Sequence, residues 1–437
     1  MIRIGDKLFR AKCRGSTLLA LLRLPAAAAS PPHRAFSNKV HPDSSFKINP
    51  VALEMTNYAL SLARSEKSGD AYAQAQLVLE QCYSTHSDEN VRGMVVLAMS
   101  SLLYHSGNYE EAIEKLQKIQ NLSLSSMIIR VAASEAIVGL HLELGQDDAA
   151  AATADMCLQL LETIKLDIGT EGIEALVDQS KALKGLVELI RGNTESAMPC
   201  FPEGRYGDCS SFVMGGQCTG NAALSYGEFL HHKSDFEMAK HMYTKVIGEE
   251  FLGKESSNLH QLSACNMNFE DTIVGATCAL GQLEAQLGNF ENAEKMLTAA
   301  LKKAEQTLGD QHPKIGAILT CIALMYRHKA TVERSSSLLI QEGLYRRAIE
   351  LFKAPPLDFK GAQEQACRRD LIALVRGGYA EILCLQQNRK GEGERMKLWA
   401  ESAWSNPTLS LAQALEPPPS NSSSKVTVID TRICRII

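Results

Sequence analysis

The stretch TCALGQLEAQLGNFENAEKMLTAAL, residues 277–301, decides the fold. An apolar run with small residues leads to Gly288 and Asn289, Phe290 follows, and an amphipathic segment that opens with an acidic residue completes the stretch. Glycine favours the end of a helix, and acidic side chains favour the positively polarised start of the next one. The stretch therefore predicts a helix, a tight turn and a second helix.

The same spacing occurs seven times along the chain: a turn residue, Ala five positions later, and a bulky residue four positions after that in most copies. The copies are Asp70/Ala75/Leu79, Gly107/Ala112/Leu116, Gly145/Ala150/Ala154, Gly192/Ala197/Phe201, Ser234/Ala239/Tyr243, Gly288/Ala293/Leu297 and Gly343/Ala348/Phe352. Helices that cross closely need a small residue at the crossing and a bulky one a turn later to fill the groove. The repetition predicts an all-α protein built from stacked helical pairs.

Another copy, VLAMSSLLYHSGNYEEAIEKLQKI at 96–119, matches the first stretch almost position by position. This pattern resembles the tetratricopeptide repeat family, and LGDQHPKIGAILTCIALMY at 308–326 resembles the longer repeats of kinesin light chains. The resemblance covers most of residues 56–355. It implies a right-handed α-solenoid of about seven to eight helix-turn-helix pairs, with a last pair that ends near Trp404.

The chain departs from a regular repeat in two ways. Successive turn residues lie 37, 38, 47, 42, 54 and 55 positions apart, so the linkers or helices are lengthened. In the third turn-marked repeat after Asp70, Lys184 replaces an apolar residue, and Pro199 and Pro202 interrupt the second helix. We expect no regular binding surface there.

Composition divides the chain into five parts. A segment at 1–36 and a linker at 37–50 precede N-terminal repeats at 51–205 and C-terminal repeats at 206–405. Residues 250–271 are predicted to be a polar spacer, and residues 331–342 an insertion between two helices. Residues 406–437 are predicted to be a disordered tail, because their last residues alternate like a short strand with no partner strand.

The first 36 residues hold seven basic residues and a single acidic one. An arginine-rich, acid-poor, amphipathic start is typical of an organellar presequence. The sequence Arg34-Ala35-Phe36-Ser37 resembles the cleavage site of mitochondrial presequences, especially those of plants, with cutting between Phe36 and Ser37. The sequence predicts a mitochondrial protein, in the matrix; a chloroplast protein is the alternative, since the two classes of transit peptide share this composition. The other alternative is a disordered basic tail without a targeting role.

Without those 36 residues the chain has 38 basic and 49 acidic residues, a net charge of −11. So acidic a surface repels phosphate backbones and disfavours nucleic-acid binding. No apolar run of 18 residues free of charge occurs, so we expect no membrane span.

The residues of common catalytic and metal sites lack the required spacing. The twelve cysteines form no CxxC pair, and Cys200, Cys209 and Cys218 lie nine positions apart, too far for a typical zinc knuckle. His231 and His232 are adjacent and face different sides of a helix, so they are predicted to be solvated or half-buried rather than metal ligands. We expect no enzymatic activity, cofactor or metal.

Binding is expected on the first helices of the pairs, which line one side of such arrays. The resemblance places five candidate groove residues there: Gln282, Ala285, Thr320, Leu324 and Arg327. Co-chaperones of the family grip a C-terminal carboxylate with Lys, Asn and Arg at such positions. This chain instead has Met94, Leu97 and Ser101 in one copy and Asn221, Leu224, Ser225 and Glu228 in another, so we expect no docking of that kind.

These observations predict a non-enzymatic scaffold or adaptor that binds a protein or peptide in mitochondria and serves in assembly or quality control. The alternative is an organellar RNA-binding protein, because pentatricopeptide arrays also consist of helical pairs behind a presequence. The irregular spacing and the net acidity disfavour that alternative.

Overall fold

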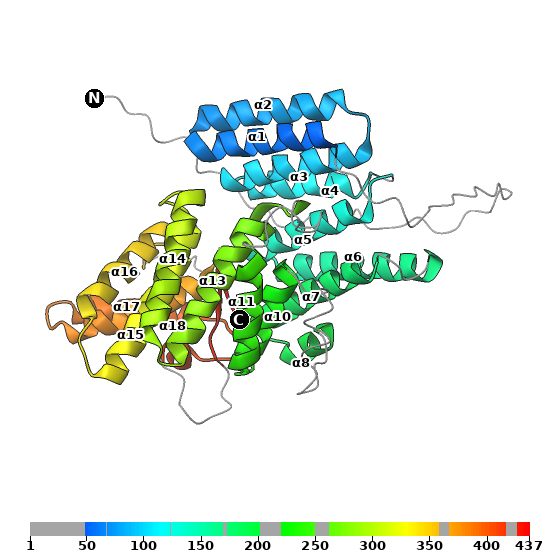
Figure 1. Ribbon diagram of the computed structural model, residues 1–437. Coiled ribbons are helices and arrows are strands. Elements are labelled where there is room, and N and C mark those ends of the chain that lie inside the picture. The colour runs from blue at the N-terminus through cyan, green and yellow to red at the C-terminus, as the bar shows by residue number, and fades with distance from the viewer. Residues whose placement is uncertain are drawn as a thin grey trace, which may run out of the picture. The chain divides into compact units, whose positions relative to one another are not determined.

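The computed structural model describes residues 49–66, 68–122, 124–168, 173–201, 220–249, 262–357, 367–416 and 426–437. They form an all-α helical-repeat solenoid in which most helices pack against their successors (Figure 1). The predicted presequence, its cleavage site at Phe36 and Ser37 and most of the 37–50 linker lie outside the described residues. No helix of the described part is both long and apolar enough to cross a membrane.

Eight helical pairs follow one another in the described residues. The first helices are α1 (Pro50–Glu66), α3 (Glu89–His105), α5 (Met127–Glu143), α7 (Glu174–Ile190), α10 (Gly220–His232), α13 (Phe269–Gln286), α15 (Pro313–Glu333) and α17 (Arg369–Leu385). The second helices are α2 (Gly69–Thr85), α4 (Tyr109–Ile119), α6 (Asp147–Ile168), α8 (Thr194–Ala197), α11 (Phe236–Glu249), α14 (Phe290–Leu308), α16 (Leu338–Leu351) and α18 (Lys390–Ala403). Each first helix also contacts the first helix of the next pair.

A shared turn connects the two helices in most pairs. In the α13–α14 turn, Gly288 has a left-handed φ of 79°, and the Asn289 amide donates to the Glu284 carbonyl at 2.8 Å. These features cap the carbonyls at the end of α13. Left-handed φ values recur at the predicted turn residues Gly107, Gly145, Gly192 and Ser234.

The repeated alanines lie at the helix crossings, as predicted. They have no exposed surface: Ala75, Ala112, Ala150, Ala197, Ala239, Ala293 and Ala348. The facing small residues are equally constrained. A Cβ atom added to Gly281 of α13 would lie 2.7 Å from Leu297 Cγ of α14, and one added to Gly227 of α10 would lie 2.7 Å from Tyr243 Cε1 of α11. Glycine is therefore required for the close approach of these helices.

The last marked copy is the exception. Gly343 lies inside α16 rather than at a turn, and the chain reverses at Arg334, which has φ 50°. The predicted insertion at 331–342 is therefore wrong as a separate loop. Its two ends belong to α15 and α16, and the buried face of α16 already begins inside it, with Gln341, Tyr345, Ala348 and Leu351 at helical spacing.

The fourth pair is shortened, as its prolines predict. α8 is followed by a single 3₁₀ turn, η2 (Met198–Cys200), which contains Pro199. Phe201 then packs where a Cβ atom on Gly185 would otherwise lie, and its ring stacks on Phe229 of α10 at 5.0 Å. One hydrophobic cluster therefore continues across the 205/206 boundary that the sequence suggested.

The predicted disordered tail at 406–437 is wrong for its described residues. Residues 411–415 form α19 (Leu411–Leu415), and the last residues form a hairpin of β1 (Ile429–Asp430) and β2 (Arg435–Ile436). The strands pair antiparallel with Ile429 opposite Ile436, so the segment that seemed to lack a partner strand pairs with itself. We call residues 426–437 the C-terminal hairpin.

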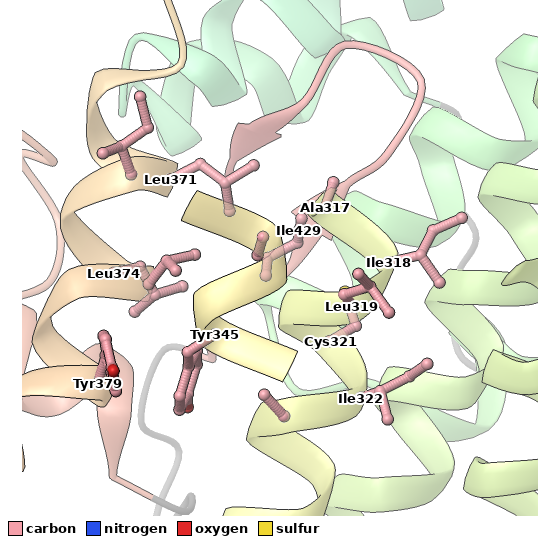
Figure 2. Close-up of a cluster of buried hydrophobic side chains, with 14 of the residues drawn as sticks. Ala317, Ile318, Leu319, Cys321, Ile322, Tyr345, Leu371, Leu374, Tyr379 and Ile429 are labelled. Atoms are coloured by element: carbon pink, nitrogen blue, oxygen red, sulfur yellow. The ribbon is translucent and has the colours of Figure 1, made fainter. Parts of the chain in front are cut away.

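Both faces of the C-terminal hairpin are buried. Ile429 belongs to the same buried cluster as Leu371 and Leu374 of α17 and Ala317 of α15 (Figure 2). Val428 on the neighbouring position packs in a second cluster, with residues of α7, α10 and α13. The alternation in the sequence reflects burial against two sets of helices rather than one buried and one solvated face.

The predicted polar spacer at 250–271 is wrong for its second half. Its described residues include the 3₁₀ turn η4 (Cys265–Met267), which is buried against α3 and α5. The Cys265 amide donates to Ser101 Oγ at 3.0 Å, and Asn266 donates to the Gly139 carbonyl at 2.8 Å. Apolar and amide side chains of this segment therefore fill space beside the first helices.

Candidate functional site

Side chains of α10 and α13 hold the backbone of the C-terminal hairpin. Gln282 donates to the Ile429 carbonyl at 2.9 Å and accepts from the Ile429 amide at 2.8 Å. One turn further along α13, Gln286 donates to the Thr427 carbonyl at 3.3 Å, and His232 Nδ1 of α10 lies 3.2 Å from the Val426 carbonyl. These contacts recognise an extended backbone independently of its side chains.

A row of polar residues on α10 binds the Arg432 side chain of the hairpin. Glu228 Oε2 lies 2.5 Å from Arg432 Nη2, Asn221 Oδ1 lies 3.0 Å from Nη1, and Ser225 Oγ lies 3.2 Å from Nη2. Their spacing of four and three residues places them on one face of the helix. Asp430 of the hairpin adds contacts at 2.9 and 3.2 Å, so the guanidinium, which has no exposed surface, is held from several sides.

The stem of Arg432 passes beside Gly275 of α13. A Cβ atom at Gly275 would lie 3.1 Å from Arg432 Cγ and 2.9 Å from Leu224 Cδ2. The absence of a side chain at Gly275 thus makes room for the chain's own arginine. We call Asn221, Ser225, Glu228, His232, Gln282 and Gln286 the hairpin site.

A second arginine anchors the other strand. Arg435 pairs with Asp147 at the start of α6 at 2.9 and 3.0 Å and donates to the Leu142 carbonyl in α5 at 2.9 Å. A cation is favoured beside the negatively polarised end of a helix. The two arginines therefore tie the hairpin to α5, α6 and α10, which are far from it in sequence.

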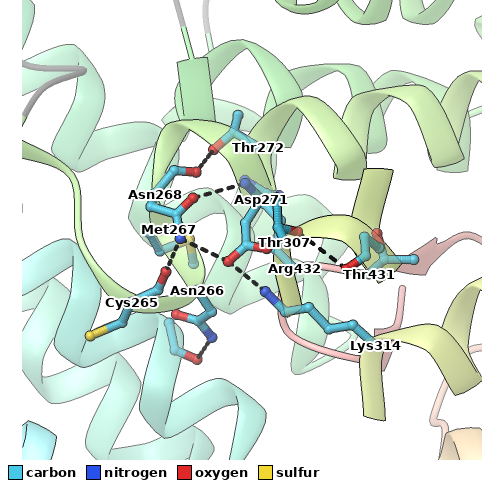
Figure 3. A network of polar contacts seen from close by, with 12 residues as sticks. Cys265, Asn266, Met267, Asn268, Asp271, Thr272, Thr307, Lys314, Thr431 and Arg432 are labelled. Atoms are coloured by element: carbon cyan, nitrogen blue, oxygen red, sulfur yellow. Dashed lines mark hydrogen bonds and ion pairs between the residues drawn. The ribbon is translucent and has the colours of Figure 1, made fainter. Parts of the chain in front are cut away.

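Buried charges continue beside the hairpin site. Lys314 of α15 pairs with Asp271 of α13 at 2.8 Å, and Asn268 donates to the same carboxylate at 2.9 Å (Figure 3). Glu143 of α5 pairs with Arg368 at 2.5 Å. Each of these four charges has a partner of opposite sign, which buried ions need to offset desolvation.

Burial shifts two titratable groups near the hairpin. Burial raises the pKa of Glu135 in α5 to about 7, although hydrogen bonding from Gln179 and the charge of Arg432 oppose the shift. Burial lowers the pKa of His231 in α10 to about 4, against a hydrogen bond with Gln286. His231 and His232 are both fully buried, so the prediction of solvated or half-buried histidines is wrong. Their rings contact hydrogen-bonding partners in the packed interior instead of water.

The five candidate groove residues divide into three environments. Gln282 contacts an extended segment, but that segment belongs to the same chain. Ala285 and Thr320 are buried, and Thr320 donates to the Gly316 carbonyl, so the prediction that these two face an open groove is wrong. Leu324 is half-buried against the hydrophobic cluster that α15, α16 and α17 share. Arg327 pairs with Glu381 and donates to the Leu415 carbonyl of α19 at 2.8 Å.

Of the predicted cysteine cluster only Cys200 is described, and Cys209 and Cys218 lie outside the described residues. Burial raises the pKa of the Cys200 thiol, which keeps it protonated at neutral pH. Burial likewise raises the pKa of Cys434 in the hairpin, to about 12. Within the described part, no three His, Cys, Asp or Glu side chains are grouped to hold a metal ion.

Sequence reasoning missed the larger part of the hairpin site. The sequence analysis named Asn221, Ser225 and Glu228 only as residues that do not grip a carboxylate. Their side-chain oxygens instead suit a guanidinium. Their common helical face and the Asp430-Thr431-Arg432 run were available signals. In comparisons with known proteins, no family model matches the chain, and no curated protein matches it either.

Proposed function

We propose that this protein is a non-enzymatic scaffold of mitochondria whose row of first helices binds an extended segment of a protein partner. The observation that carries the proposal is the hairpin site, where side chains of two first helices hold an extended backbone and an arginine. Such contacts are those by which helical-repeat surfaces recognise peptides.

The chemistry of the site supports binding rather than catalysis. Glu228 of the site is buried in an ion pair with Arg432 of the hairpin, an arrangement that holds a bound segment in register. The arginine-rich start of the sequence supports the mitochondrial location, and the tetratricopeptide-like spacing supports the adaptor role.

Affinity purification of the tagged full chain from isolated mitochondria tests this function. We expect a partner in constant ratio to the chain, retained after washing at moderate salt. Fractionation of the cells reports the compartment in the same experiment. A monodisperse chain that purifies without any protein in constant ratio, or that is absent from mitochondria, would contradict the proposal.

A further inference from the structure

We propose that the C-terminal hairpin is a cis ligand: it occupies a peptide-binding site that also accepts a partner segment of the same chemistry, an extended apolar stretch followed by Asp-x-Arg. This inference rests on the proposed scaffold function and specifies what the scaffold binds. The hairpin would then regulate access to the row of first helices.

The hairpin is held as a ligand is held. Among the described residues β1 and β2 pair only with each other, and the hydrogen bonds that helices make to the hairpin backbone come from their side chains. Gln282 satisfies both the amide and the carbonyl of Ile429. A side-chain amide can make the same pair of contacts with any extended segment that takes this place.

Charge makes the site selective for arginine. Glu228 has almost no exposed surface and lies 2.5 Å from the Arg432 guanidinium, with Asn221 and Ser225 completing the contacts. A ligand without a cation would leave Glu228 buried and unpaired, which is costly. Arg suits this place better than Lys, because its planar fork can contact several oxygens at once.

Most of the packing between helices does not involve the hairpin. It contributes Ile429, Cys434 and Ile436 to one cluster and Val428, Ile433 and Ile437 to another. Helices supply most of the remaining members of both clusters, and each first helix packs on its second helix. Departure of the hairpin therefore leaves the helical crossings in place and exposes the hairpin site.

The test cuts the hairpin from the rest of the folded full chain. A site-specific protease sequence replaces residues 418–424, between α19 and the hairpin, and the purified chain is cleaved in the folded state. A fluorescent peptide with the sequence of residues 426–437 is then added, and its anisotropy is followed before and after cleavage. One matched peptide carries Arg432→Gln. The control peptide carries Thr427→Ala, because Gln286 donates to the backbone carbonyl of Thr427, which this substitution keeps.

We expect the cleaved chain to bind the fluorescent peptide at least about tenfold more tightly than the uncut chain does, because the linked hairpin no longer competes at high local concentration. The Arg432→Gln peptide should bind at least about tenfold more weakly than the parent, and the Thr427→Ala peptide should equal the parent. Circular dichroism should show unchanged helicity after cleavage.

Three results would overturn the proposal: a folded, cleaved chain that takes up no peptide, equal binding of the Arg432→Gln peptide, or loss of helicity on cleavage. The last result would make the hairpin an integral part of the fold. If mitochondrial partners still bind the uncut chain and saturating peptide does not displace them, the scaffold function stands and the cis-ligand proposal fails.

Discussion

The crossing between α13 and α14 and the hairpin site on the other side of α13 differ in how their parts are brought together. At the crossing, Gly281 approaches Leu297 within one pair of helices, which a short turn at Gly288 connects. At the hairpin site, Gln282 contacts Ile429, 147 residues away in sequence. Local spacing therefore defines the repeat, whereas long-range polar contacts define the surface that binds.

The largest expected effect separates the two regions through charge. Arg432→Ala should lower the free energy of unfolding by about 3–5 kcal/mol, because it leaves Glu228 and Asp430 buried without their cation. Arg347→Ala is the matched control. Its pair with Glu350 is solvent-exposed and is expected to contribute less than about 1 kcal/mol. Urea unfolding of the two variants beside the parent measures both values, and equal losses would mean that Arg432 is not buried in an ion pair.

Packing at the crossing should give the next largest effect. Ala293→Phe forces a bulky ring between α13 and α14 and should cost about 1–3 kcal/mol. Ala299→Phe on the exposed face of the same helix should cost less than about 1 kcal/mol. Thermal or urea unfolding distinguishes them. Melts of Ala293→Phe that match those of the parent would place this alanine outside a crossing.

A pH series probes the buried polar groups beside the hairpin. The folded-state pKa of His231 is about 4, below its ordinary value of about 6.5, so the unfolded chain binds more protons between these values. The stabilisation from the neutral imidazole is complete above pH 6.5 and is lost as the pH falls towards 4. His231→Gln should therefore reduce the loss of stability between pH 7 and pH 5 by roughly 1–2 kcal/mol. An unchanged loss in the variant would show that His231 stays solvated in the folded chain.

The smallest effect contrasts two glycines that the sequence pattern treats alike. Gly288 has a left-handed φ of 79°, so Gly288→Ala should cost about 1 kcal/mol. Gly343 lies inside α16 with open space around its Cα, so Gly343→Ala should stabilise the chain by about 0.5–1 kcal/mol. Changes of opposite sign in the free energy of unfolding, measured with urea, support the observed turn at Arg334. Equal destabilisation by the two substitutions would instead indicate a turn at Gly343.

The helical pairs could be predicted because their signals are local. Gly288 and Ala293 mark a turn and a crossing within one pair, and Pro313 begins α15 as its missing amide hydrogen permits. The turn predicted at Gly343 was wrong, because glycine also occurs inside helices and does not by itself mark a turn. The buried face of α16, with Gln341, Tyr345, Ala348 and Leu351 at helical spacing, runs through Gly343 and places the turn before it.

The hairpin site could be predicted only in part. Gln282 was placed on a first helix that contacts an extended segment, but nothing local in the sequence says that this segment is residues 426–437. The alternation in that segment suggested a strand and left its partners open. Burial on both faces and the pairing of Arg432 with Glu228 arise from contacts across some 200 residues, which spacing does not encode.

Hydrogen–deuterium exchange of the C-terminal hairpin in the full chain tests the central claim most directly. The Ile429 amide donates to Gln282 and the Ile437 amide donates to the Val428 carbonyl at 2.9 Å, so both should exchange at least about 10³-fold more slowly than in an unstructured peptide. Exchange of these amides at the rate of an unstructured peptide would contradict a hairpin bound to the first helices.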